Sequence, residues 1–218
     1  MVSRKQRKID DYKRRIPFKE PRKSILIVCE GSKTEPIYFA SLKNTLRLII
    51  ADVEIVGEGA APITVVNKAI EMREERKHIA KRSLTKSAYE LVYCVIDVES
   101  PVRHESLARA INKAQDNRLE VILSNPCFEY WYILHFRKTS APFHTNVEAI
   151  SALRREHPTY RKDDTTIFDV VYPRTGNAIK HSKEVLKEQH NDAEDLRDCN
   201  PSTHVHKIVE YLQSIARQ

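Results

Sequence analysis

The chain alternates between short apolar runs, which predict β-strands, and longer stretches with helical spacing, which predict α-helices. The run SILIVCE, residues 24–30, is almost wholly apolar and rich in β-branched residues, as in a strand covered on both faces. After it, Thr34 is a candidate helix cap, Glu35 favours the positive end of a helix, and Pro36 fits the first turn. The alternation continues through ADVEIVG, a helix opened by Pro62, AYELVYCVIDVES, a helix from Ser100 through Ala114, LEVILSN, and the apolar helix PCFEYWYILHF.

This order of four strands, each followed by a helix, predicts an α/β fold. Such alternation is typical of a mostly parallel, Rossmann-like sheet with helices on both faces and right-handed crossovers. In open parallel sheets, sites form beyond the carboxyl ends of the strands. The polar residues at those strand ends are therefore the first candidates for chemistry.

From about Thr139 onward the pattern is mainly helical. VEAISALRREH and NAIKHSKEVLKEQH predict helices, and TTIFDVVY predicts a short strand or an extended segment. The chain ends in an amphipathic helix, for which Ser202 or Thr203 is the candidate cap. We therefore expect three parts: a basic flexible arm at 1–23, an α/β core at 24–138, and a helical C-terminal extension at 139–218 packed on the core.

Positive charge is concentrated near the N-terminus. The chain has a formal net charge of +7, and residues 3–23 are dense in Lys and Arg and poor in apolar side chains. A segment of this composition does not bury enough apolar surface to fold alone. The sequence leaves two interpretations open: an arm that binds nucleic acid through its phosphates, and a solvated tail.

Composition argues against several kinds of site. The four cysteines form no CxxC pair, so neither a thiolate zinc site nor a disulfide framework is expected. No GxxxxGK[ST] loop occurs, so any use of ATP would require a partner chain. No apolar run approaches the roughly 20 residues of a membrane helix, and the first residues lack the apolar stretch of a secretory signal. We expect a cytoplasmic protein without membrane contact.

Three carboxylates stand at the predicted carboxyl ends of two strands. Glu30 ends the first strand, and Asp97 and Glu99 end the third, two residues apart and so on one side of it. Carboxylates that converge repel one another unless a cation neutralises them. Mg²⁺ prefers such oxygen ligands together with substrate phosphates. Acidic residues also end strands without any such role, and Glu99 can simply begin the turn into the next helix, so spacing alone leaves both interpretations open.

Four motifs in order resemble the RloB family: LIVCEGSKTEPIYF, CVIDVES, LSNPCFEYWYILHF and NPST. That family is similar to Toprim-domain enzymes, which implies a Toprim-like sheet in this chain. The resemblance implies acid–base chemistry for Glu30 and binding of Mg²⁺, or Mn²⁺, by Asp97 and Glu99. Glu99 stands where Toprim enzymes carry a second aspartate. All three carboxylates, Glu30 included, are candidate metal ligands.

Further residues are expected near the same edge of the sheet. The candidate contacts to nucleic-acid phosphates are Lys33, Arg103 and Lys162. The candidate supporting residues behind the metal site are Ser124, Asn125 and Glu129. Solvated charges are the ordinary alternative for the cations. Glu129 is interpreted as either a fourth carboxylate of the site or a favourable residue in the first turn of a helix.

The resemblance implies a Mg²⁺-dependent nuclease that cleaves DNA or RNA. It also implies a role in anti-phage defence, by abortive infection, beside an ATPase partner protein. The alternative hypothesis is a nucleic-acid-binding or assembly subunit of an ATPase complex with no catalysis of its own. An oligomer is compatible with either hypothesis.

Overall fold

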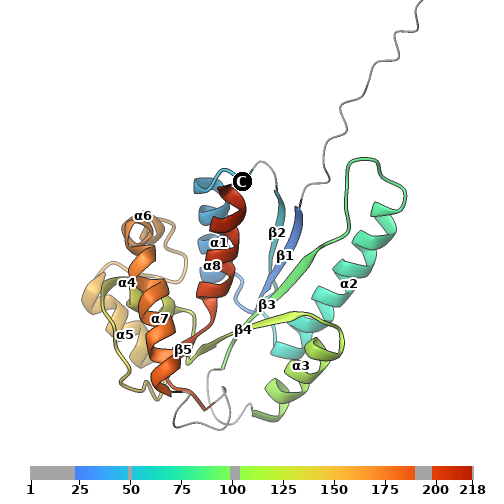
Figure 1. The fold of residues 1–218 in the computed structure, drawn as a ribbon. Coiled ribbons are helices and arrows are strands. Elements are labelled where there is room, and N and C mark those ends of the chain that lie inside the picture. The colour runs from blue at the N-terminus through green and yellow to red at the C-terminus, as the bar shows by residue number, and fades with distance from the viewer. Residues whose placement is uncertain (1–22, 49–50, 99–103, 190–197, 218) are drawn as a thin grey trace, which may run out of the picture.

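The computed structural model describes residues 23–48, 51–98, 104–189 and 198–217, and these form a five-stranded sheet in the order β2-β1-β3-β4-β5 (Figure 1). The first four strands are parallel, and β5 runs antiparallel to β4 at one edge. The strands are β1 (Lys23–Cys29), β2 (Ala51–Gly57), β3 (Leu91–Asp97), β4 (Glu120–Asn125) and β5 (Ser202–Thr203). The predicted α/β class with a mostly parallel sheet is confirmed.

Helices cover both faces of the sheet, as the alternating sequence predicted. One face packs against α2 (Pro62–Ala80) and α3 (His104–Asp116). The other face packs against α1 (Thr34–Thr45), α4 (Glu129–Phe136) and α8 (Val205–Ala216). The start of α3 was predicted at Ser100, which lies outside the described residues.

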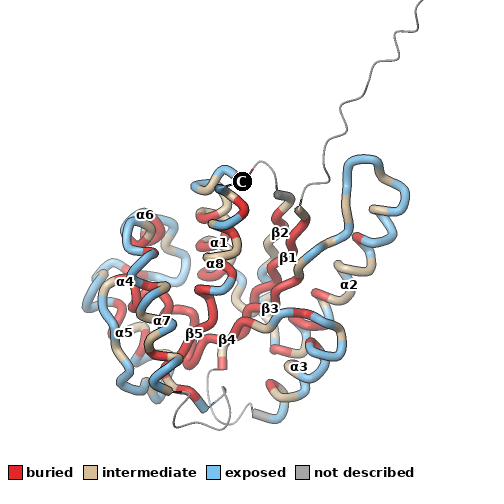
Figure 2. Tube along the Cα trace, in the orientation of Figure 1, coloured by how far each residue is buried: buried red, intermediate tan, exposed pale blue. Residues whose placement is uncertain are grey.

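The interior position of β1 in the sheet, between β2 and β3, explains why its sequence is apolar throughout. Ile25, Ile27 and Cys29 belong to the core shared with α1, α4 and α8. Leu26 and Val28 belong to the core shared with α2 and α3. All five side chains are fully buried (Figure 2), because successive residues of a strand point to opposite faces and both faces are covered.

The C-terminal part is mainly helical and packs on the sheet through α4 and α8. Helix α4 contacts both α5 and α7. The remaining elements are α5 (Asn146–Glu156), α6 (Ile167–Val171), the 3₁₀-helix η2 (Tyr172–Arg174) and α7 (Thr175–Gln189). Among the described residues, no helix has both the length and the apolar character needed to span a membrane.

The segment TTIFDVVY was predicted as a strand or an extended segment, and this prediction is wrong. It forms α6 and the start of η2. The Asp164 carboxylate accepts hydrogen bonds from the backbone N–H groups of Thr166 (2.7 Å) and Ile167 (3.2 Å), which satisfies the first donors of the helix. Ile167, Phe168 and Val171 are buried at a spacing that suits one face of a helix. The β-branched residues of this segment suggested a strand, but the hydrogen bonds to Asp164 and the burial of one face stabilise a helix instead.

The prediction that Ser202 or Thr203 caps the last helix holds in part, because the Thr203 hydroxyl accepts a hydrogen bond from the Val205 N–H, the first donor of α8, at 3.3 Å. Both residues form β5, and the residue before α8 is His204, whose side chain makes no capping hydrogen bond. The Thr203 hydroxyl lies 2.9 Å from the Ser124 hydroxyl, and the His204 N–H donates to the Leu123 carbonyl at 2.9 Å. The buried edge of β4 needs backbone partners, and this distant segment supplies them.

Candidate active site

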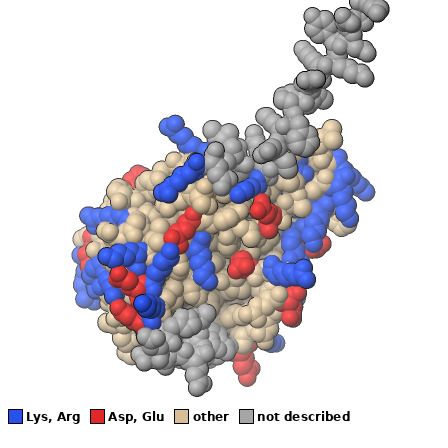
Figure 3. Space-filling model, in the orientation of Figure 1, with Lys and Arg blue, Asp and Glu red and all other residues tan. Residues whose placement is uncertain are grey.

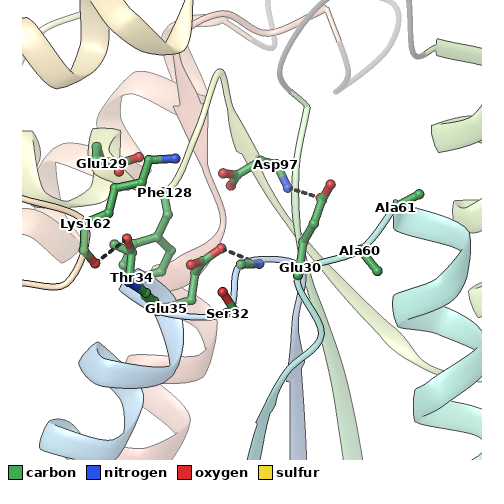
Figure 4. Close-up of a pocket in the computed structure, with 13 residues that line it drawn as sticks. Glu30, Ser32, Thr34, Glu35, Ala60, Ala61, Asp97, Phe128, Glu129 and Lys162 are labelled. Carbon is green, nitrogen blue, oxygen red and sulfur yellow. Dashed lines mark hydrogen bonds between the residues drawn. The ribbon is translucent and has the colours of Figure 1, made fainter.

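The candidate site lies where the order of the strands reverses. From β1 the chain crosses to β2 on one side, and β3 lies on the other side, so a crevice opens beyond the carboxyl ends of β1 and β3. The Glu30 N–H donates to the Val95 carbonyl at 2.9 Å, which joins these two strand ends. The Asp97 N–H in turn donates to the Glu30 carboxylate at 3.1 Å (Figure 4). A cavity of about 400 Å³ opens at this point.

Six of the thirteen described residues that line the cavity are charged, and they come from four separate segments. Figure 4 shows the carboxylates gathered at its centre and the Lys162 side chain extending into it, with the ammonium end turned toward Asp97. Its charged lining residues are Glu30, Lys33, Glu35, Asp97, Glu129 and Lys162. Four carboxylates therefore face two lysines, which leaves the cavity with an excess of negative charge.

One oxygen of the Asp97 carboxylate, Oδ1, is buried and accepts no hydrogen bond. Burial, together with the negative charges of Glu35, Glu129 and Glu30, raises the pKa of Asp97 well above its usual range. A hydrogen bond from the Phe128 backbone to this carboxylate opposes the rise of its pKa. A buried carboxylate oxygen without a donor is costly, so this position favours either a proton or a cation.

Glu35 is a site residue that the sequence analysis missed. Its carboxylate is buried (4% exposed) and accepts a hydrogen bond from the Gly31 N–H at 3.1 Å. Burial, and after it the negative charge of Glu129, raises the pKa of Glu35, although the nearby Lys162 opposes the shift. In the sequence, Glu35 was explained only as an acid at the positive end of a helix, and it was therefore not considered as part of the site. The available signal was its place in the first helical turn directly after the end of β1.

Glu129 is the first residue of α4 and also lines the cavity, and its role as a fourth carboxylate of a metal site stays a prediction. It is 2% exposed, and the Tyr160 hydroxyl donates to its carboxylate at 2.9 Å. Burial and the negative charge of Glu129 raise the pKa of Tyr160 far above its usual range, so this phenol remains a proton donor.

The two lysines reach the cavity from different parts of the chain. Lys33 precedes α1, is largely exposed, and lies 3.9 Å from the Asp163 carboxylate. Lys162 belongs to the loop between α5 and α6, and its backbone carbonyl accepts a hydrogen bond from the Thr34 hydroxyl at 3.0 Å. Thr34 was expected to cap α1, and this prediction is wrong, because the helix begins at Thr34 itself and the hydroxyl bonds outward to the distant loop.

The family model described as RloB-like protein matches residues 25–212, which is most of the chain. This chain belongs to the RloB-like family. The match spans β1 through most of α8, and so includes every described residue that lines the cavity. No curated protein and no solved structure is significantly similar to the chain.

The structure places only some of the predicted site residues of this RloB-like protein. It brings Glu30, Lys33, Asp97, Glu129 and Lys162 together around one cavity. The supporting residues Ser124 and Asn125 are buried in β4 and are not part of the cavity lining. Glu99 and Arg103 lie outside the described residues, so their roles stay predictions.

The donor set of the cavity fits a hard divalent cation. Carboxylate oxygens are the protein ligands that Mg²⁺ prefers, and it usually takes one or two of them together with water and phosphate oxygens. Asp97 offers a buried oxygen that lacks a hydrogen-bond donor, and four acids but only two lysines are among the described residues that line the cavity. Across the ranges that the structure describes, no three or more His, Cys, Asp or Glu side chains are grouped so that they could hold a metal ion by themselves. The cavity thus fits an open site with few protein ligands.

Gly31 leaves room for the Glu35 carboxylate, which packs against its backbone and accepts its N–H hydrogen bond. A Cβ atom at residue 31 would overlap that carboxylate. We expect Gly31→Ala to displace the Glu35 carboxylate and to lower catalytic activity at least tenfold, with little loss of stability, because the displaced atoms are the far end of a flexible side chain. The matched control is Gly176→Ala, because a Cβ there meets nothing within 4 Å. Urea unfolding and activity measured on both variants test this, and unchanged activity in Gly31→Ala would contradict it.

Basic side chains on the visible surface gather over α2, at the right of Figure 3. Lys77, Lys81 and Arg82 are exposed near the C-terminal end of this helix. A helix of 19 residues is about 28 Å long, and Ala61 at its opposite end lines the cavity. These cations therefore lie at the end of α2 that is remote from the cavity.

Proposed function

We propose that this RloB-like protein is a Mg²⁺-dependent phosphodiesterase that cleaves nucleic acid. The observation that carries the proposal is the buried Asp97 oxygen without a hydrogen-bond donor, beside Glu30 at the reversal of strand order. A cluster of four acids repels the phosphates of a nucleic acid unless a cation lies between them. A site that requires both a cation and a phosphate is the arrangement expected for metal-assisted phosphoryl chemistry.

Each residue has a distinct proposed role. Asp97 and Glu99 would hold Mg²⁺, or Mn²⁺, which when bound would polarise the phosphate and stabilise the leaving oxygen. Glu30 moves a proton or contributes a further ligand. Lys162 and Lys33 contact phosphate oxygens. The N-terminus of α2, where Ala60 and Ala61 line the cavity, directs the positive end of the helix toward the same place.

We also infer a Toprim-type mechanism and a role in defence against phage beside an ATPase partner. The support is the order of the motifs, with a glutamate after β1 and an Asp-x-Glu pair beginning at the last residue of β3. The sequence has no phosphate loop of its own for ATP, so this inference assigns ATP hydrolysis to the partner. Nucleic acid and this partner are the two macromolecules expected to bind the chain.

The test is a cleavage assay with single- and double-stranded DNA and RNA, each with Mg²⁺, Mn²⁺ or EDTA. We expect cleavage of at least one substrate with Mg²⁺ or Mn²⁺, no cleavage with EDTA, and loss of cleavage in Glu30→Gln. Binding without cleavage under every divalent metal, with the ATPase partner present, would overturn the proposal. That outcome would support the alternative of a non-catalytic nucleic-acid-binding or assembly subunit.

A further inference from the structure

The loop between α5 and α6, residues 157–166, is attached to the cavity at two points. The Tyr160 hydroxyl donates to the Glu129 carboxylate at 2.9 Å, and both side chains are buried at 2% exposure. The Thr34 hydroxyl donates to the Lys162 carbonyl at 3.0 Å. Figure 4 shows this second contact at the base of the Lys162 side chain, directly below the point where it enters the cavity.

Contacts within the helical part stiffen the same loop. The His157 ring lies 3.2 Å from the Asp164 carboxylate, which closes the two ends of the loop on each other. Arg154 in α5 donates from Nε to the Tyr160 carbonyl at 3.2 Å. Because the ends and the middle of the loop are both held by hydrogen bonds, its attachment to the cavity sets where Lys162 lies.

The Thr34 contact is not what the start of a helix requires. A hydroxyl at the N-cap accepts from the backbone N–H groups of the first turn, but Thr34 is the first residue inside α1, whose N-cap is Lys33. The Thr34 hydroxyl donates to a carbonyl 128 residues away, and the N-cap of α1 makes no side-chain hydrogen bond. Thr34 therefore serves the loop rather than its own helix. Tyr160 likewise satisfies a buried carboxylate that lacks a counter-charge on its own helix turn.

We propose that Thr34 and Tyr160 are positioning residues: Thr34 places Lys162 against the substrate phosphate, and Tyr160 holds the Glu129 carboxylate at the wall of the cavity. They join a cation supplied by the helical C-terminal part to the carboxylates supplied by the sheet. This inference deepens the proposed function and rests on it, since Lys162 is the group that contacts the phosphate. Thr34 acts through Lys162, and Tyr160 acts through Glu129, so each pair has a coupling that can be measured.

The first test is a double-mutant cycle of Thr34→Val and Lys162→Met. We expect Thr34→Val to lower kcat/KM about 3- to 10-fold, the size of one hydrogen bond, and Lys162→Met to lower it on the order of 100-fold. The double variant is expected to equal Lys162→Met, because residues that act as a unit are not additive. Thr34→Ser, which keeps the hydroxyl, restores wild-type kinetics. The inference would be overturned if the fold-losses in kcat/KM of the two single variants multiply in the double variant, or if Thr34→Val keeps full activity.

The second test repeats the cycle for affinity, in a Glu30→Gln background that does not cleave. Fluorescence anisotropy with labelled single-stranded DNA and RNA gives the Kd of each variant. Here too Thr34→Val weakens binding only while Lys162 is present. A parallel pair, Tyr160→Phe with Glu129→Gln, is expected to show the same lack of additivity in kcat/KM.

The two tests separate failure of this inference from failure of the proposed function. A wild-type protein that binds but never cleaves removes the proposed function, while coupled Kd values for Thr34 and Lys162 still support the positioning role. A protein that cleaves with multiplicative losses removes the positioning role alone. Absence of both cleavage and binding removes both.

Discussion

Replacing Asp97 by alanine is expected to abolish Mg²⁺-dependent cleavage while leaving the fold intact. The side chain ends β3 at the cavity and contributes the oxygen that lacks a hydrogen-bond donor. Loss of a metal-assisted step worth several kcal/mol corresponds to a fall in rate of about 10³-fold or more. The fold is retained because the contact with Glu30 uses the backbone N–H of residue 97, which alanine keeps. The measurement is the single-turnover rate with Mg²⁺ in excess.

The matched control for this variant is Asp116→Ala. Asp116 is an exposed aspartate at the C-terminal end of α3, so the same chemical change there touches no part of the cavity. We expect wild-type cleavage from the control, and the same circular dichroism spectrum from both variants. Cleavage by Asp97→Ala within tenfold of the wild-type rate would show that the chemistry lies elsewhere.

The second large effect is on stability, where Asp97→Asn is expected to stabilise the protein without divalent metal. The pKa of Asp97 is raised in the folded state by burial and by three neighbouring acids. A carboxyl with a raised folded pKa stabilises the fold below its unfolded value of about 4, and this contribution is lost as the pH rises through the folded pKa. Near neutral pH the wild-type fold therefore carries a penalty that the neutral amide does not.

The expected gain is about 1–2 kcal/mol in the free energy of unfolding, typical of relieving strain at a functional site. It corresponds to a Tm increase of about 2–4 °C for each kcal/mol in a chain of this size. In EDTA, the difference between Asp97→Asn and wild type should shrink as the pH falls toward about 4, where both side chains are neutral.

Mg²⁺ supplies the complementary measurement. A ligand at 100 times its Kd stabilises the folded state by about 2.7 kcal/mol, so the Tm of the wild type should rise with Mg²⁺ and that of Asp97→Asn should rise far less. Asp116→Asn is the control, with the wild-type response to both pH and metal. If Mg²⁺ raises the Tm of wild type and Asp97→Asn equally, Asp97 is not a ligand of the metal.

Much of the fold follows from local patterns in the sequence. The apolar run of β1 and the alternation of strands with helices predict the parallel sheet, because both depend on periodicities of neighbouring residues. The same reasoning places Glu30 and Asp97 at one edge, since the carboxyl ends of parallel strands meet there. The amphipathic pattern of α8 is equally local, and its predicted face, including Val205 and Leu212, is buried.

The tertiary structure decides what those patterns leave undetermined. Ser202 and Thr203 become a strand because β4 has a buried edge to satisfy, and no neighbour in sequence reveals that need.

The composition of the cavity was also decided by packing. The sequence by itself determined that two acids, Glu30 and Asp97, stand at the same edge of the sheet, because strand direction and residue spacing fix their place, whereas the adjacency of the two strands came from the fold. Only the fold decided that Glu35 turns back toward them and that Lys162 arrives from a loop more than a hundred residues further along. These contacts depend on burial and hydrogen bonds between distant segments, and such energies have no signature in local spacing.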